Sequence, residues 1–235
     1  MFVAGLVRGF SGFALSALVM AAAASFISPV LLIPILWFQE MAASMMMAQS
    51  GWKDSDRKTA LLLVAGNWIG WPFGLYLTTT LPDTQSKMIA LIIIITLAAM
   101  QLKRFRIPGL ATTIGTLITG IVAGVVSGIA HVGGMVVALY VLAQNTAARS
   151  MRGTLVLYLF LGSLGALVVQ LLYSVMTYDA MIRGITLMPV TMIGVWLGMH
   201  LFNPRWEPYY KPFCLGLLIA LAAFGLVRLG LDQAG

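Results

Sequence analysis

The chain is short of charged residues. Asp, Glu, Lys and Arg make up only 9% of its 235 residues, whereas soluble globular domains have about 25%. Hydrophobic residues make up 60%, and the mean hydropathy is +0.97. Because so few polar side chains cannot cover a surface that faces water, the composition excludes a soluble globular domain.

Cysteine and histidine are also scarce, with one cysteine, Cys214, and two histidines in the whole chain. A single cysteine excludes an intramolecular disulfide and a four-cysteine metal site. The glycine-containing stretch GLVRGF (5–10) lacks the Gly-Lys-Ser/Thr ending of a phosphate-binding loop. We therefore expect no metal, no cofactor and no catalytic residues, and the chain is not predicted to be an enzyme.

Long apolar runs take the place of the missing polar surface. About 20 apolar residues are needed to cross the roughly 30 Å of hydrocarbon in a bilayer. Residues 1–24, where Arg8 interrupts the apolar run, are interpreted as membrane structure rather than as a removable signal peptide. We predict an all-α, polytopic transmembrane helical bundle of about eight spans in the cell inner membrane, with the clearest apolar runs at 61–81, 88–102, 154–176, 185–202 and 213–227.

The second half of the chain repeats the first. IGWPFGLYL (69–77) falls on IGVWLGMHL (193–201), and this register continues without a gap to residue 104. Apolar composition alone would match fewer glycines and basic residues, so a duplication is indicated. We predict two related transmembrane repeats, 1–104 and 111–231, which together form a single membrane domain.

The start of each half carries a cluster of small residues. GLVRGFSG (5–12) resembles GIVAGVVSG (120–128), because both contain Gly-xxx-Gly followed by Ser-Gly. Small residues four apart allow helices to pack closely. In duplicated transporters, however, such residues also break helices near the bilayer midplane, where half-helix N-termini face anions. We expect broken or re-entrant helices here, with Ser11, Gly12, Ser127 and Gly128 offering hydroxyl and backbone N–H donors.

Basic residues outnumber acidic residues, 14 to 7. They lie in short loops rather than on one stripe, so the positive-inside bias explains the net charge, and the lipid bilayer rather than nucleic acid is the expected partner. Inverted repeats would place most of them on the cytoplasmic side. That set is Lys53, Arg57, Lys58, Lys103, Arg104, Arg106, Arg149, Arg152, Arg205 and Lys211, against Lys87, Arg183 and Arg228 on the other side.

Four ionisable residues lie within or beside the spans, where a charge is costly and often functional. Arg8 is the strongest candidate for holding an anion, because a guanidinium fork matches the oxygens of a carboxylate, sulfonate or phosphate; the alternative is a side chain that snorkels to the headgroups. Arg152 is either a second cation for the anion or a loop-flanking anchor. Glu40 is a candidate for proton coupling, or the ion-pair partner of Arg8. His131 is a proton-coupling and substrate-binding candidate, or a packed, hydrogen-bonded histidine.

Two stretches resemble the motifs of a known family. GLVRGFSGF (5–13) resembles the opening motif of the sulfite exporter TauE/SafE transporters, and residues 133–160 resemble their second-half motif, in which Gly-Gly precedes a short apolar helix, Leu-Tyr-x-Leu and an Arg. The loop GWKDSDRK (51–58) fits the same pattern. The resemblance implies two related bundles of about four helices each, and proton-linked or facilitated movement of small sulfur-containing anions. By position, the family motifs match Arg8, Ser11, Gly12, Gly133, Gly134 and Arg152.

The sequence therefore predicts a secondary transporter that moves a small anion, an organosulfonate or sulfite, by alternating access, with proton coupling as an option. Two other functions compete with it. A rhomboid-like intramembrane serine protease would use Ser11 as nucleophile and His131 as base, although the Ser-Gly pair recurs in the second half. A membrane scaffold without transport activity would tolerate Arg8→Gln. The substrate-binding candidates are Arg8, Ser11, Gly12, Ser127, Gly128, His131, Gly133, Gly134 and Arg152.

Overall fold

The structure, a computed structural model, describes residues 1–103, 112–144, 147–201 and 207–234. These residues form ten α-helices and no strand. Seven of the helices are long and apolar enough to cross a bilayer. The predicted all-α, polytopic helical bundle is therefore confirmed, and the chain is a multi-pass membrane protein.

The helices fall into two groups of five in chain order. The first group is α1 (Phe2–Ser11), α2 (Leu15–Ala23), α3 (Pro29–Asp54), α4 (Arg57–Thr80) and α5 (Asp83–Leu102). The second group is α6 (Thr113–Ala130), α7 (Gly133–Ala143), α8 (Ala148–Leu172), α9 (Tyr178–His200) and α10 (Glu207–Ala234). The family resemblance implied about four helices in each half. Five are described in each because the first helix of each half is followed, at a sharp break, by a separate short helix.

Polar caps and a proline set the turns between the spans. The side chain of Asp56 accepts a hydrogen bond from the N–H of Thr59 at 3.2 Å and so begins α4. Pro29 occupies the first turn of α3, where the N–H that proline lacks would have no helical partner in any case. Only Ser55 and Asp56 separate α3 from α4, so the chain reverses direction within two residues.

Glycines let two pairs of helices pack with their backbones in contact. α4 lies against α6, where a Cβ on Gly70 would overlap the carbonyl oxygen of Ile121. α1 lies against α9 in the same manner, with Gly9 against the carbonyl of Val195. Small residues four apart permit this close approach. Since each pair joins a helix of the first half to a helix of the second, the two halves interlock.

The α1–α9 contact and the α4–α6 contact involve corresponding residues of the two halves. Gly5 packs on Thr191 and Gly124 packs on Asn67, and Asn67 is the residue that falls on Thr191 when the two halves are aligned. Gly5 therefore corresponds in the structure to Gly124, one helical turn beyond Gly120, with which the sequence aligned it. The sequence could not choose between them, because glycine recurs every fourth residue in this helix. The matched contacts support the duplication, which stays a prediction.

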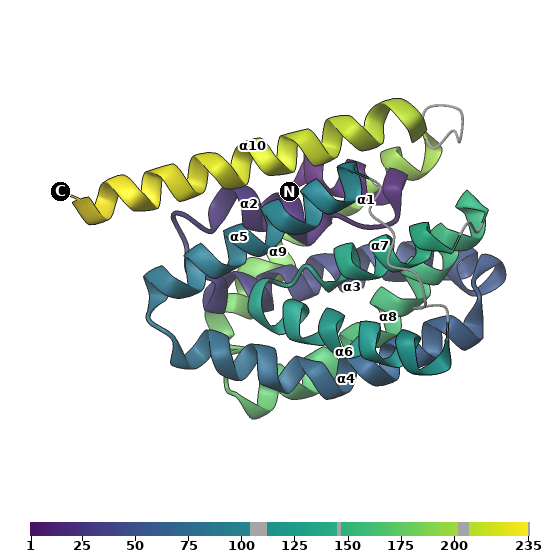
Figure 1. Cartoon of the computed structure of the whole chain (residues 1–235), viewed down its shortest axis with the longest axis horizontal. Coiled ribbons are helices and arrows are strands. Elements are labelled where there is room, and N and C mark those ends of the chain that lie inside the picture. The colour runs from purple at the N-terminus through teal and green to yellow at the C-terminus, as the bar shows by residue number, and fades with distance from the viewer. Residues whose placement is uncertain (104–111, 145–146, 202–206, 235) are drawn as a thin grey trace.

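α3 and α8 pack antiparallel through the middle of the bundle. The indole N–H of Trp37 donates to the carbonyl of Ser163 at 2.8 Å, and further along α3, Gly51 packs on Val156 of α8. The long helices lie along one axis, and these two run in opposite directions (Figure 1). Because α3 and α8 hold the same place in the order of the two halves, their opposite directions are what inverted repeats would give.

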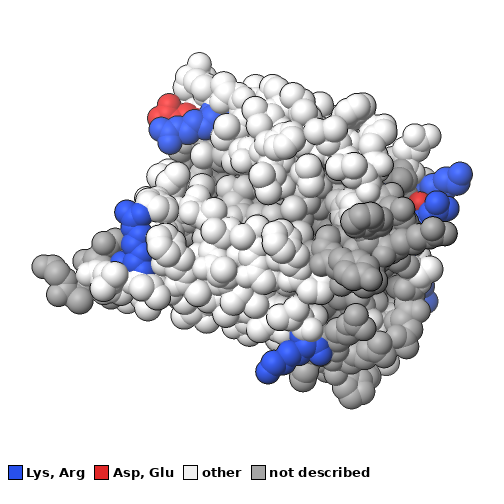
Figure 2. Space-filling model, turned by 90° about the horizontal axis from the view of Figure 1, so that it is seen from above, with Lys and Arg blue, Asp and Glu red and all other residues white. Residues whose placement is uncertain are grey.

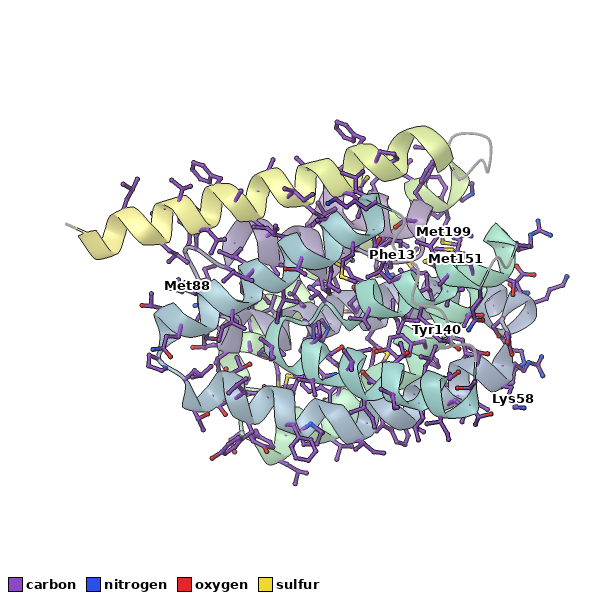
Figure 3. The ribbon with its side chains drawn as sticks, in the orientation of Figure 1. Phe13, Lys58, Met88, Tyr140, Met151 and Met199 are labelled. Carbon is purple, nitrogen blue, oxygen red and sulfur yellow. The ribbon has the colours of Figure 1, made fainter. Side chains whose placement is uncertain are left out.

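The two ends of the bundle are marked by Lys58 and Met88, which lie at opposite ends of the long axis (Figure 3). Arg149 shares the end of Lys58, since it faces Asp54 at 4.0 Å. The broad middle of the face in Figure 2 carries no charged side chain, and the blue and red side chains lie at its margins. An uncharged belt between charged ends is the surface that a bilayer requires. Arg104, Arg106 and Arg205 lie outside the described residues.

Candidate functional site

Each half has a helix break: the first lies at Gly12, as predicted, and the second lies at His131, three residues beyond the predicted Ser127-Gly128, which are helical residues of α6. After α1 the backbone of Gly12 turns left-handed (φ 83°), and after α6 that of His131 does the same (φ 56°). Glycine adopts a positive φ freely, whereas histidine does so at some cost. The residues that follow Gly12 border a small cavity, and His131 and Glu40 line both that cavity and a second one beside it. The two breaks therefore converge on Glu40, which lies in the middle of α3.

Arg8 is the central charge of the first break, and its side chain is completely buried. Its Nε donates to Oε2 of Glu40 at 2.9 Å, one terminal nitrogen donates to Oγ of Ser44 at 2.9 Å, and the other donates to the carbonyl of Gly12. The second Glu40 oxygen accepts from the hydroxyl of Ser16 at 2.8 Å and from its N–H at 3.3 Å. The ion pair thus ties α1 and α2 to α3, and both of its side chains are buried within the protein.

The guanidinium of Arg8 still has donors to offer. Arginine carries five N–H groups, and within the described part of the chain each of its three nitrogens has one acceptor. Each terminal nitrogen therefore keeps a second N–H without an acceptor there. Two parallel N–H groups on a planar fork match two oxygens of a sulfonate or carboxylate.

Arg152 brings a second cation to the same break. One of its terminal nitrogens donates to the carbonyl of Gly9 at 2.6 Å, near the C-terminal end of α1, where helix carbonyls and the helix dipole favour positive charge. Its side chain also lies against Gly12, where an added Cβ would come within 2.9 Å of the Arg152 Cγ. Ser11 is occupied locally, because its hydroxyl bonds the carbonyls of Val7 and Phe13 at 2.8 and 2.7 Å.

The second break borders a polar cavity of about 30 Å³. The Nδ1 atom of His131 is buried and has no hydrogen-bond partner among the described residues, and the ring of Trp71 meets the imidazole edge-on at 5.8 Å. The hydroxyl of Tyr158 donates to Oδ1 of Asn67 at 2.8 Å. The cavity is lined by Glu40, Asn67, Trp71, Ser127, His131, Gly134, Tyr158, Leu159, Gly162, Ser163 and Ala166.

Two of the predicted glycines face neighbouring helices. Gly128 packs on the backbone of α4 at Trp71 and Leu75, and its carbonyl accepts from Thr78 at 3.0 Å. Gly133 packs on α6 at Ala123. Neither is among the residues that line the two polar cavities. Arg8, Ser11, Gly12 and Arg152 also lie outside these two linings, whereas His131 and Gly134 line both cavities and Ser127 lines one.

The protease alternative gains no support from this geometry. The hydroxyl of Ser11 donates within its own segment, and no hydrogen bond joins Ser11 to His131 in the residues described. A Ser–His dyad requires the base within hydrogen-bond reach of the nucleophile.

Four polar residues of the site were not predicted: Ser16, Ser44, Asn67 and Tyr158. Only ionisable residues and the serines of the two Ser-Gly pairs were distinguishable as candidates by the criteria of charge and recurring small residues. Asn67 interrupts the apolar run 61–81, and an uncharged polar side chain at that depth also needs a partner. Counting amides, hydroxyls and tyrosines inside apolar runs would have found it.

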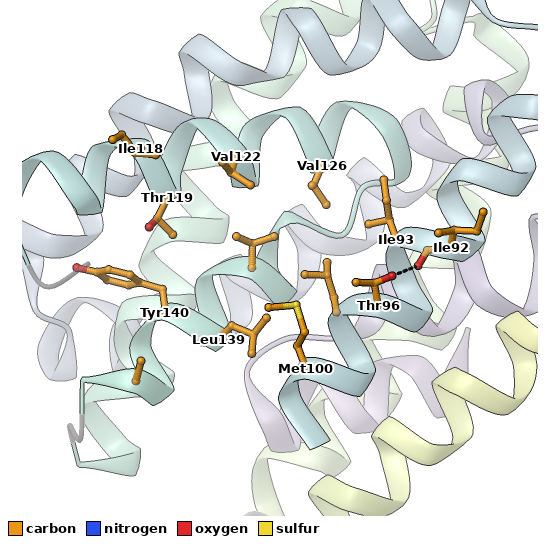
Figure 4. A pocket seen from close by; sticks show the side chains of 13 residues that line it. Ile92, Ile93, Thr96, Met100, Ile118, Thr119, Val122, Val126, Leu139 and Tyr140 are labelled. Atoms are coloured by element: carbon orange, nitrogen blue, oxygen red, sulfur yellow. Dashed lines mark hydrogen bonds between the residues drawn. The ribbon is translucent and has the colours of Figure 1, made fainter. Parts of the chain in front are cut away.

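A larger cavity, of about 440 Å³, lies between α5, α6 and α7 (Figure 4). Its wall is apolar except for three hydroxyl groups. Those of Thr96 and Thr119 donate to carbonyls of their own helices at 2.8 Å, and that of Tyr140 bonds Thr116 at 2.6 Å. Since no polar group of this wall is left to bind an anion, the polar side chains around Glu40 are the better candidate site, and the cavities among them have volumes of about 30 and 10 Å³.

Comparison with known proteins adds one finding. Residues 1–225 match the sequence profile of the family described as Sulfite exporter TauE/SafE. No curated protein and no solved structure matched the chain. The match covers both breaks, both cations and the whole of α3.

Proposed function

This chain belongs to the sulfite exporter TauE/SafE family of membrane proteins, and from this premise we propose that it is a secondary transporter that carries a small anion across the inner membrane by alternating access. The anion is expected to be an organosulfonate or sulfite. The observation that carries the proposal is the guanidinium of Arg8, which is wholly buried beside the first break, pairs with Glu40 and has one acceptor for each nitrogen among the described residues.

The charge balance of the site supports an anion as ligand. Arg8 and Glu40 form a buried pair with no net charge. An unpaired charge within a bilayer is costly, so the pair is compensated while the site is empty. An anion that binds the outer N–H groups of Arg8 makes the site negative, and a proton on Glu40 would restore neutrality. Anion binding and protonation of Glu40 would therefore favour each other.

The arrangement of the helices supports alternating access. The short helices α2 and α7 begin at the two breaks, and the N–H of Ser16, in the first turn of α2, already donates to a carboxylate oxygen at 3.3 Å. Helix N-termini that face a midplane site are typical of duplicated transporters, in which one repeat rocks against the other. We propose that repeats 1–104 and 111–231 are inverted and move in this way around Arg8.

A thermal-shift screen tests the proposal. The purified protein would be heated with sulfite, sulfoacetate, taurine, sulfate and simple carboxylates, because a ligand that binds the folded state raises its melting temperature. The test variant is Arg8→Gln combined with Glu40→Gln, which removes both buried charges together. The matched control is Arg183→Gln, an exposed arginine near the start of α9.

We expect at least one anion to stabilise the parent and the control but not the double variant. Liposomes that contain the protein should then take up that anion, which separates a transporter from a membrane scaffold. A double variant that responds to anions as the parent does, or the absence of any response in the parent, would remove Arg8 from the site.

A further inference from the structure

We propose that the cavity between His131 and Glu40 holds a water molecule that passes a proton between the imidazole and the carboxylate. This water would couple anion movement to proton movement. The inference deepens the proposed function and rests on the same site, but its central test does not depend on transport.

The cavity has the size and chemistry that a bound water needs. Its volume is about 30 Å³, which exceeds the roughly 10–15 Å³ that one water molecule requires. A buried water also needs two to four polar partners. Glu40, Asn67, Ser127, His131 and Tyr158 all line this space.

The orphaned nitrogen of His131 is the strongest sign of a missing partner. Its Nδ1 atom is buried and unbonded among the described residues, although buried polar atoms are nearly always hydrogen-bonded to protein or to ordered water. The residue also holds a left-handed backbone, φ 56°, at the position where the first half has Gly12. A histidine at a position whose left-handed backbone favours glycine indicates a role for the imidazole itself.

The proposed step moves one proton and breaks no other bond. The imidazolium gives the proton on Nδ1 to the water, and the water gives one of its own protons to a carboxylate oxygen of Glu40. A neutral imidazole and a neutral carboxyl remain. The carboxyl no longer balances the charge of Arg8, whose Nε lies 2.9 Å from it, so the guanidinium becomes the natural partner of an arriving anion. One proton would accompany each added negative charge.

No other charged group competes for this water within the described residues. Glu40 faces it from α3, with Arg8 of α1 on the far side of the carboxylate, and Tyr158 faces it from α8. The uncharged neighbours come from the remaining elements around the cavity: Asn67 and Trp71 of α4, Ser127 of α6, Gly134 of α7, and Ser16 of α2 in the adjoining space.

The direct test observes the imidazole by nitrogen NMR. The chain has only two histidines, so a His200→Gln background leaves His131 as the single labelled ring. We expect the chemical shifts of the ring nitrogens of His131 to change with pH. We also expect water-edited spectra to show contact between the ring and water. Glu40→Gln should move the titration, whereas Asp179→Asn, which removes an exposed carboxylate at the start of α9, should not.

A cavity-filling variant removes the water without touching either titratable group. Gly134 lines both polar cavities, and the three atoms nearest to a Cβ there all belong to the side chain of Leu159, at 3.3 to 3.8 Å. Gly134→Ala should therefore fold and abolish the water contact of the ring. Gly216→Ala is the matched control, because a Cβ on Gly216 meets nothing within 4 Å.

Transport in liposomes distinguishes this inference from the proposed function. Radiolabelled sulfoacetate is the probe, and the test variant is His131→Asn, because asparagine tolerates a left-handed backbone. The ratio of uptake with a proton gradient to uptake without one should fall to about one, the value for zero coupling.

Three results would overturn the inference: a ring that shows no contact with water, a titration that Glu40→Gln leaves unmoved, or undiminished proton-driven uptake in His131→Asn. If the parent exchanges no sulfoacetate at all, the choice of substrate is at fault, and the NMR result still decides whether the water bridge exists.

Discussion

Removing one member of the Arg8–Glu40 pair should destabilise the protein far more than removing both. Arg8→Gln deletes the cation from a pair whose side chains are 0% and 5% exposed and lie 2.9 Å apart. Among the described residues, the Glu40 carboxylate would then keep only its bonds from Ser16. Breaking a buried pair in this way costs about 3–5 kcal/mol, because an uncompensated charge remains.

That free energy corresponds to a readily measured change in melting temperature. For chains of this size, each kcal/mol lowers the melting temperature by roughly 2–4 °C, so Arg8→Gln should lower it by roughly 6–20 °C. Adding Glu40→Gln removes the orphaned charge and should recover most of the loss, since two neutral amides can bond each other at this distance. Such a recovery would show that the pair as a whole contributes little to stability.

Thermal unfolding of the purified protein in one detergent measures these differences. Arg149→Gln is the control, because Arg149 meets Asp54 only at 4.0 Å and its side chain is 82% exposed, and exposed ion pairs contribute little. The reasoning is wrong if Arg8→Gln lowers the melting temperature no more than Arg149→Gln does, or if the double variant is less stable than the single one.

Three further predictions test other parts of the structure. Tyr158→Phe leaves Oδ1 of Asn67 without its 2.8 Å donor and should cost about 1–3 kcal/mol in unfolding measurements, unless water takes the place of the hydroxyl. Gly70→Ala places a methyl group on the Ile121 carbonyl and should lower the melting temperature sharply, whereas Gly216→Ala should not; equal melting temperatures would contradict the α4–α6 contact. Ser11→Ala should retain anion uptake, and loss of a proteolytic activity in this variant would instead revive the protease hypothesis.

Much of the fold could be predicted from composition and spacing alone. A spanning helix satisfies its own backbone hydrogen bonds, so an apolar run such as 61–81 identifies α4 without knowledge of its neighbours. Charge within such runs is rare enough to mark a site, which is why Arg8, Glu40, His131 and Arg152 could be named before any contact was known. The small residues that recur beside a serine in each half placed the first break at Gly12 correctly and the second within three residues of its position at His131.

Only the tertiary structure decided which helices contact one another. The sequence left Arg8 open as a headgroup anchor, an anion site or a partner of Glu40, and only the packing of α1 on α3 brought the two charges within 2.9 Å. It also could not separate Gly128 and Gly133, which pack on helices, from Gly134, which lines the cavity. A hydropathy pattern records whether a residue faces an apolar environment, and lipid and protein interior are equally apolar. Which helix faces which therefore depends on the close fit of small residues, as at Gly9 and Gly70, and that fit exists only once the chain has folded.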